Sequence, residues 1–179
     1  MAVTLEGLDA RLRNRIETLL ARCLEDGVEM RPYTAMRTPL EQAMLWRQSR
    51  AREEIQLKIA DLRQKGARYL VRCLEAAGSQ HGPHVTDALP GFSWHQWGEA
   101  VDCFWLVEQK AEWSTRRLVD SRNGYQHYAS VAAGLQLTAG GLWARFKDWP
   151  HVQLRPENSP FSVMGLANID AQMAERFPL

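Results

Sequence analysis

Two histidines and two aspartates are the side chains of this sequence best suited to chemistry. His95 and Asp102 lie seven residues apart in Ser-Trp-His-Gln-Trp-Gly-Glu-Ala-Val-Asp, and Asp148 and His151 lie three apart in Asp-Trp-Pro-His. Imidazole nitrogens and carboxylate oxygens are ligands that zinc accepts, and a catalytic zinc keeps three protein ligands and one position for water. His95, Asp102 and His151 could supply those ligands. Asp148 could then accept the proton of the water as a general base.

Asp102 is unusual because it interrupts the apolar run Ala100–Val107, which is typical of a strand buried within a sheet. A lone buried carboxylate is costly, so it must be paired, hydrogen-bonded or bound to a metal. Taken alone, a salt bridge is the commoner explanation. His95 favours the metal, and Gly98 offers the bend that this requires, since an odd separation on one strand would place the two side chains on opposite faces.

Asp148 and His151 also have a simpler interpretation, as a surface aspartate and a hydrogen-bonded histidine. The metal is favoured because the two segments supply complementary parts of one site. The sequence has no His-Glu-x-x-His segment, which excludes the common helical arrangement of zinc proteases.

The pattern Ser-x-His-x-x-Gly-x-Ala-x-Asp, followed by Asp-x-x-His, resembles the signature of the D-Ala-D-Ala metallopeptidase group. This group includes zinc D-Ala-D-Ala carboxypeptidases and the L-alanyl-D-glutamate endopeptidases of phage endolysins. The resemblance implies one zinc ion per chain, bound by His95, Asp102 and His151, with Asp148 as the catalytic base.

The segment Met-Arg-Thr-Pro-Leu-Glu-Gln (36–42) resembles a further element of the group, Arg-Ser/Thr-x-x-x-Gln. The resemblance implies that Arg37 lies by the substrate and stabilises developing negative charge, which suits a guanidinium. The alternative is a surface arginine near a helix start, where the helix dipole does not favour a cation. We expect Gln42, Ser93 and Trp94 to contact the substrate or to line its cleft.

The resemblance implies a zinc-dependent peptidase that hydrolyses the peptide stem of bacterial peptidoglycan. Residues 134–153 most resemble the endopeptidase branch, which favours an endolysin-like L-alanyl-D-glutamate endopeptidase. The alternatives are a D-Ala-D-Ala carboxypeptidase and a non-catalytic module that binds cell-wall peptides. A lysis enzyme or a toxin delivered by a partner would share the chemistry.

Composition limits the other classes of function. The 179 residues carry a net charge of +1, which argues against a nucleic-acid partner, and they are 45% hydrophobic, as in an ordinary globular protein. No stretch approaches the ~20 apolar residues of a membrane span, and the N-terminal residues lack the apolar run of a signal peptide. We expect a protein made in the cytoplasm that acts on the cell wall or periplasm after release or export. We also expect a monomer, with three buried free thiols rather than disulfides.

The elements that must position the site indicate an α+β fold. We expect one domain over residues 1–179, in which a small, mostly antiparallel sheet carries the zinc site and packs with several helices. It would comprise a helical part (1–78), a metal-binding core (79–155) and a C-terminal tail or helix (156–179). Periodicity and capping residues predict helices over 8–24, from Thr38 through Trp46, over 53–77 with an interruption at Gly66, over 123–133 and over 168–176, and strands over 28–36, 100–107 and 152–154.

Overall fold

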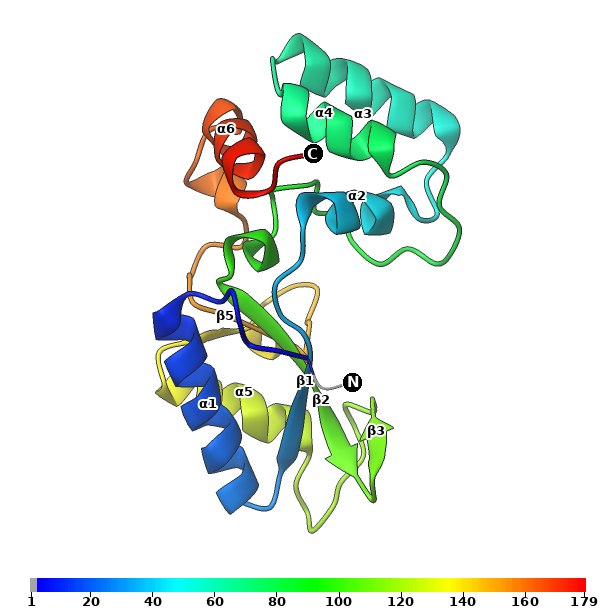
Figure 1. Cartoon of the computed structure of the whole chain (residues 1–179). Coiled ribbons are helices and arrows are strands. Elements are labelled where there is room, and N and C mark those ends of the chain that lie inside the picture. Colours follow the sequence, from blue (N-terminus) through cyan, green and yellow to red (C-terminus); the bar gives the residue numbers. More distant parts are fainter. Residues whose placement is uncertain (1–2) are drawn as a thin grey trace. The chain divides into compact units, whose positions relative to one another are not determined.

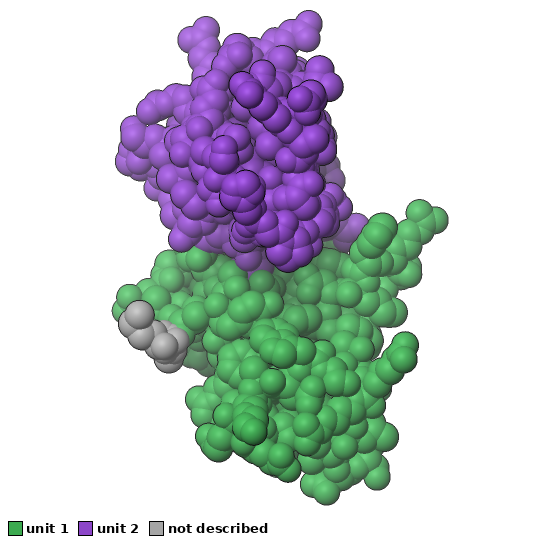
Figure 2. Space-filling model, turned by 90° about the vertical axis from the view of Figure 1, so that its right-hand side faces the viewer, with its two compact units in different colours: residues 1–36, 98–156 green, residues 37–97, 157–179 purple. Residues whose placement is uncertain are grey.

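The computed structural model describes residues 3–179, and the chain forms two compact units (Figure 2). The sheet unit comprises the residues up to Met36 together with Gly98–Pro156, and the helical unit comprises Arg37–Trp97 with Glu157–Leu179. Within residues 3–179, six α-helices and a small antiparallel sheet confirm the α+β class. The single domain and its three parts stay predictions.

An antiparallel sheet is the centre of the sheet unit (Figure 1). Its order is β1-β2-β5-β4, and the short β3 pairs with the end of β2. The bounds are Glu29–Thr34 for β1, Ala100–Val107 for β2, Lys110–Glu112 for β3, Thr138–Ala139 for β4 and His151–Gln153 for β5. The central β2 is the apolar strand that contains Asp102, and its first four residues are all buried, as its composition predicts.

Two helices pack against this sheet, α1 (Ala10–Glu25) and α5 (Gly124–Gly134) (Figure 1). α1 buries one apolar stripe, and Asp9 caps its first turn by accepting a hydrogen bond from the Arg11 backbone N–H. α5 approaches β2 closely at Gly124, where a Cβ atom would lie only 2.4 Å from the Trp105 ring. The core of the unit includes Leu12, Ile16, Leu19, Val101, Cys103, Trp105, Tyr125, Tyr128 and Val152.

The helical unit contains α2 (Pro39–Arg47), α3 (Arg52–Gln64), α4 (Arg68–Ala76) and α6 (Leu166–Arg176). Thr38 caps α2 in a capping box with Glu41, as the Thr-Pro pair predicts. The expected interruption of the segment 53–77 is also present, because Gly66 adopts φ +80° between α3 and α4. The core includes Trp46, Leu62, Leu70, Leu74, Ile169 and Met173.

The remaining elements are short. In the described part of the chain, 3-10 helices cover Trp94–Trp97 (η1), Gly140–Leu142 (η2) and Pro160–Ser162 (η3). The strand expected over 152–154 lies one residue earlier, as β5, while β3 and β4 have too few residues to leave a periodic signal in the sequence. Among residues 3–179, no helix has the length and apolar character needed to cross a membrane.

Candidate metal centre

Strand pairing brings Asp102 and His151 together. Asp102 lies opposite His151 in the antiparallel register of β2 and β5. Directly opposed residues of neighbouring strands project their side chains on the same face of the sheet. The Asp102 Oδ1 atom consequently lies 2.9 Å from His151 Nδ1, and both residues are buried.

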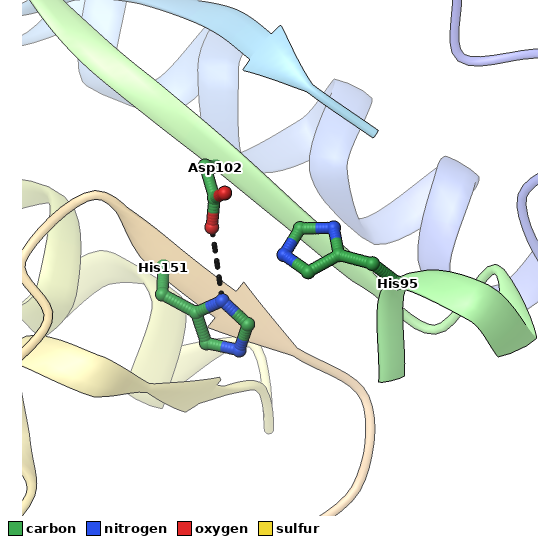
Figure 3. Close-up of side chains that lie close together, drawn as sticks. All are labelled: His95, Asp102 and His151. Carbon is green, nitrogen blue, oxygen red and sulfur yellow. Dashed lines mark hydrogen bonds and ion pairs between the residues drawn. The ribbon is translucent and has the colours of Figure 1, made fainter. Parts of the chain in front are cut away.

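His95 comes from η1, which ends just before the bend into β2. Gly98 makes this bend with φ +72°, a conformation that favours glycine, and a Cβ atom there would lie 2.7 Å from the Gly7 carbonyl oxygen. The three side chains His95, Asp102 and His151 converge (Figure 3). Each offers one ligand atom, and these three atoms all lie within 4.8 Å of one another. The bend at Gly98, expected from the sequence, is present.

The donor set fits a zinc ion. Two imidazoles and one carboxylate are nitrogen and oxygen ligands of the type that zinc binds in catalytic sites. All three residues are buried, so the charge of Asp102 needs a cation close by. A divalent metal ion bound here would supply this charge and satisfy the three ligand atoms together.

The surroundings of His151 favour the cationic form of its imidazole. Burial lowers the pKa of His151, but the hydrogen bond and the charge of Asp102 raise it, as do Asp148 and a hydrogen bond with Gln153, and the net result is a raised pKa. The Trp143 ring packs at 5.4 Å from the His151 ring, between centroids. The acidic neighbours that raise this pKa also suit a bound metal ion at His151.

Asp148 lies beside these residues on the loop that leads into β5. Its side chain is exposed, and its carbonyl oxygen accepts a hydrogen bond from the His151 backbone N–H at 3.2 Å. Its own backbone N–H donates to the Gly140 carbonyl oxygen at 3.1 Å. Gly140 fits closely, because a Cβ atom there would lie 2.4 Å from the Asp148 carbonyl oxygen. The Gly-Gly turn thus determines where Asp148 is placed.

Arg37 is held within the helical unit by a network of buried amides. Its Nη1 atom donates to Gln42 Oε1 at 2.9 Å, and its backbone N–H donates to the His95 carbonyl oxygen at 3.4 Å. Gln96 Nε2 donates to the same Gln42 oxygen at 3.2 Å. Gln42 is fully buried, and its Nε2 donates to the Ala88 carbonyl oxygen at 2.7 Å. The network joins Arg37 to the turn that carries His95.

Ser93 and Trp94 immediately precede His95 in the chain. Ser93 lies just before η1, and Trp94 is the first residue of η1. Ser93 Oγ accepts a hydrogen bond from the His95 backbone N–H at 3.4 Å. Trp94 is buried, and its indole N–H donates to the Glu157 carbonyl oxygen at 2.6 Å. Both residues shape the turn around His95. Substrate contacts by Ser93, Trp94 or Gln42 stay predictions.

Two buried glutamines, Gln96 and Gln153, were not singled out from the sequence. Gln153 Oε1 lies 2.9 Å from His151 Nε2. Period-2 spacing on a strand could have shown that Gln153 shares a face with His151. Gln96 had no comparable signal, because its contact with Gln42 joins residues 54 positions apart.

A hollow of about 760 Å³ in the helical unit is a poorer candidate for a binding site. Arginines line much of it, and several of them already have partners within the unit, such as the Leu74 carbonyl oxygen for Arg47 and Glu75 for Arg63. Arg50, for example, is nearly buried and donates to Glu54, Asp87 and the carbonyl oxygens of Trp46 and Thr86. These contacts join α2, α3 and the loop that follows α4, and they leave Arg50 little capacity for a ligand.

A family model described as VanY, D-alanyl-D-alanine carboxypeptidase, matches residues 6–134. The match covers well over half of the chain, so the protein belongs to this family. The matched residues include Arg37, His95 and Asp102 and end before Asp148 and His151. No curated protein matches the chain in sequence.

Two solved structures are similar to the chain. One is an L-Ala D-Glu endopeptidase, ChiX, from Serratia marcescens, with 18% identity over 84% of this chain and 83% of that one and a TM-score of 0.47. The other is a mutant of the vancomycin resistance D,D-pentapeptidase VanY from a VanB-type cassette, in complex with Zn(II). It has 18% identity over 86% of this chain and 76% of that one, with a TM-score of 0.46.

Membership of the family confirms the class expected from the motif. The protein is a zinc metallopeptidase of the kind that acts on peptidoglycan. The group formed by His95, Asp102 and His151 is compatible with this cofactor.

Proposed function

We propose that the protein is an L-alanyl-D-glutamate endopeptidase that cuts the peptide stem of peptidoglycan. The observation that carries the chemistry is the convergence of His95, Asp102 and His151, whose ligand atoms lie within 4.8 Å of one another. The choice of bond is supported by the sequence of residues 134–153, which resembles the endopeptidase branch. A D-Ala-D-Ala carboxypeptidase is the second candidate, because the matching family model carries that description.

His95, Asp102 and His151 would hold one zinc ion. Bound there, zinc supplies a Lewis acid that activates water and polarises a carbonyl group. Asp148 is an exposed carboxylate next to these three residues and is not itself one of the proposed ligands. Its backbone carbonyl oxygen accepts a hydrogen bond from the His151 backbone N–H. Asp148 would accept the proton of the attacking water and pass it to the leaving amine.

Arg37 would stabilise negative charge on the oxygen of the scissile group. Gln42 supports this role, because its oxygen accepts from Arg37 Nη1 and orients the guanidinium. Gln42 is fully buried, so it would act on the substrate mainly through Arg37. Ser93 and Trp94 would fix the turn of His95 and wall the cleft for the stem peptide.

The protein would act as a monomer on the cell wall or periplasm, after release or export from the cytoplasm. A nucleic-acid partner is not expected at a net charge of +1.

Digestion of purified sacculi tests the proposed bond. The zinc-loaded protein should release fragments with a new N-terminal D-Glu, identified by mass spectrometry and end-group labelling. Free D-Ala instead would establish the carboxypeptidase. The matched control is His95→Ala, which should lose both zinc and hydrolysis. Binding of stem peptides without any cleavage by the zinc-loaded wild type would establish the non-catalytic module.

A further inference from the structure

Gln153 is a buried polar side chain beside the candidate metal ligands, and neither the motif nor the proposed mechanism uses it. It is 1% exposed and lies in β5, two residues after His151. Residues i and i+2 of a strand share a face, so both side chains project toward the same side of the sheet. β5 is flanked by β2 and β4, with Ala100 and Thr138 opposite Gln153. Such a position leaves the side chain little freedom.

The orientation of the Gln153 amide follows from its two contacts. Its Nε2 group donates to the Arg155 carbonyl oxygen at 2.7 Å, which turns Oε1 toward His151. Oε1 lies 2.9 Å from His151 Nε2 and can only accept. The imidazole must therefore carry a proton on Nε2.

This proton determines the role of the other ring nitrogen. In a neutral imidazole with a proton on Nε2, Nδ1 carries a lone pair. That lone pair faces the Asp102 Oδ1 atom at 2.9 Å, and two acceptors at this distance need a cation. The arrangement suits a metal ion bound by Nδ1 of His151 and by Asp102.

We propose that Gln153 is a positioning residue that keeps the proton on Nε2 of His151 and so reserves Nδ1 for the metal. This inference rests on the proposed role of His151 as a ligand. Partners that accept from the second ring nitrogen of a ligating histidine fix its tautomer and orientation, and their loss typically costs about 10- to 100-fold in metal affinity.

The ion pair between Arg155 and Glu99 stabilises the segment that orients Gln153. The carbonyl oxygen of Arg155 accepts from Gln153, and the Arg155 side chain donates through Nη2 to Glu99 Oε1 at 3.0 Å. The Leu154 backbone N–H donates to the Glu99 carbonyl oxygen at 2.9 Å, which ties the same segment to the start of β2. Glu99 thus anchors the carbonyl group that sets the Gln153 amide.

Two substitutions at one position separate this role from packing. Gln153→Met and Gln153→Glu both remove the donor to the Arg155 carbonyl oxygen, but only Gln153→Glu keeps an acceptor for His151 Nε2. We expect Gln153→Met to weaken zinc binding by about 10- to 100-fold in competition with a chelator. Gln153→Glu should bind zinc more tightly than Gln153→Met. The control is Val152→Ala, on the opposite face of the same strand, which should lower the melting temperature and leave zinc affinity unchanged.

A spectroscopic measurement on the wild type tests the tautomer directly. In the zinc-loaded protein with 15N-labelled histidine, we expect His151 to show a protonated Nε2 and a metal-bound Nδ1. The reverse assignment would overturn the proposal even if every variant failed to fold. Zinc affinity of a folded Gln153→Met within twofold of the wild type would also overturn it, with the metal site intact. A wild type that binds no zinc would overturn the site and this inference together.

Discussion

Asp102 and His151 face each other across β2 and β5, with 2.9 Å between Asp102 Oδ1 and His151 Nδ1. Their separation along the chain is 49 residues. The buried carboxylate that interrupts an apolar strand is thereby explained, because its partner is built into the neighbouring strand. The same pair offers two of the three atoms that could hold a metal ion.

Replacing Asp148 should separate metal binding from hydrolysis. Asp148→Asn keeps the size of the side chain and removes the base, so we expect zinc content to be unchanged and turnover to fall by about 10²- to 10⁴-fold. Metal analysis and a sacculus digestion assay on the same preparation measure both. Turnover near that of the wild type would rule Asp148 out as the base.

The fit of Gly140 against Asp148 predicts an effect on activity from a single methyl group. In Gly140→Ala the new Cβ atom would lie 2.4 Å from the Asp148 carbonyl oxygen, so the Asp148 segment must move. We expect turnover to fall by about 100-fold, as small displacements of catalytic groups do. The free energy of unfolding should fall by about 1–3 kcal/mol.

Gly134→Ala is the matched control for this substitution. Gly134 ends α5 and has no atom within 4 Å of an added Cβ. We expect full turnover and a stability equal to or slightly above that of the wild type. Equal turnover in both alanine variants would show that Gly140 does not place Asp148.

Removal of zinc should destabilise the protein in a pH-dependent way. The raised pKa of His151 means that a proton competes with the metal up to a higher pH than for an ordinary histidine. Apparent zinc affinity should therefore fall as the pH decreases through this raised value. At free zinc a thousandfold above its dissociation constant, the metal adds about 4 kcal/mol to the free energy of unfolding. Calorimetry with and without a chelator, across a pH series, measures both effects. A melting temperature that the chelator does not change would contradict the site.

The cap of α1 should give an acid-sensitive contribution to stability. The hydrogen bonds from the Arg11 side chain lower the pKa of Asp9 to about 2, against 3.8 for a free carboxyl group, while its slight burial opposes this. A lowered folded-state pKa stabilises the fold above 3.8, and the contribution is lost as the pH falls toward 2. Asp9→Ala should cost about 1 kcal/mol at neutral pH and progressively less in acid.

Asn123, which caps α5, is the control for Asp9 because it does not titrate. The cost of Asn123→Ala should be independent of pH between neutral and acid conditions. Denaturant titrations of the two variants and the wild type measure these differences. A cost for Asp9→Ala that stays constant in acid would contradict the lowered pKa.

The three cysteines should be unreactive in the folded protein. Burial raises the thiol pKa to about 12 for Cys23 and Cys103 and to about 11 for Cys73, and no thiolate nucleophile forms at neutral pH. A thiol-specific reagent should label none of them in the native state and all three after denaturation. Rapid labelling of the native protein would place at least one thiol at the surface.

The sequence by itself determined the types of the site residues and the local elements that carry them. The Thr-Pro pair starts α2 as predicted, Gly66 divides α3 from α4, and the apolar run Ala100–Val107 is β2. These features depend on capping, backbone freedom and periodicity within a few residues, which a sequence displays directly. The motif also indicated the family, which the match over residues 6–134 confirms.

Only the tertiary structure decided which distant residues meet. The register of β2 with β5 places Asp102 opposite His151, and the contacts of Gln42 with Gln96 and of Gln153 with His151 set the orientation of side chains. A register is fixed by the summed burial and pairing of whole strands, and the strand that carries His151 has three residues and almost no periodic signal of its own. The chemistry is therefore encoded locally, and its geometry depends on long-range pairing.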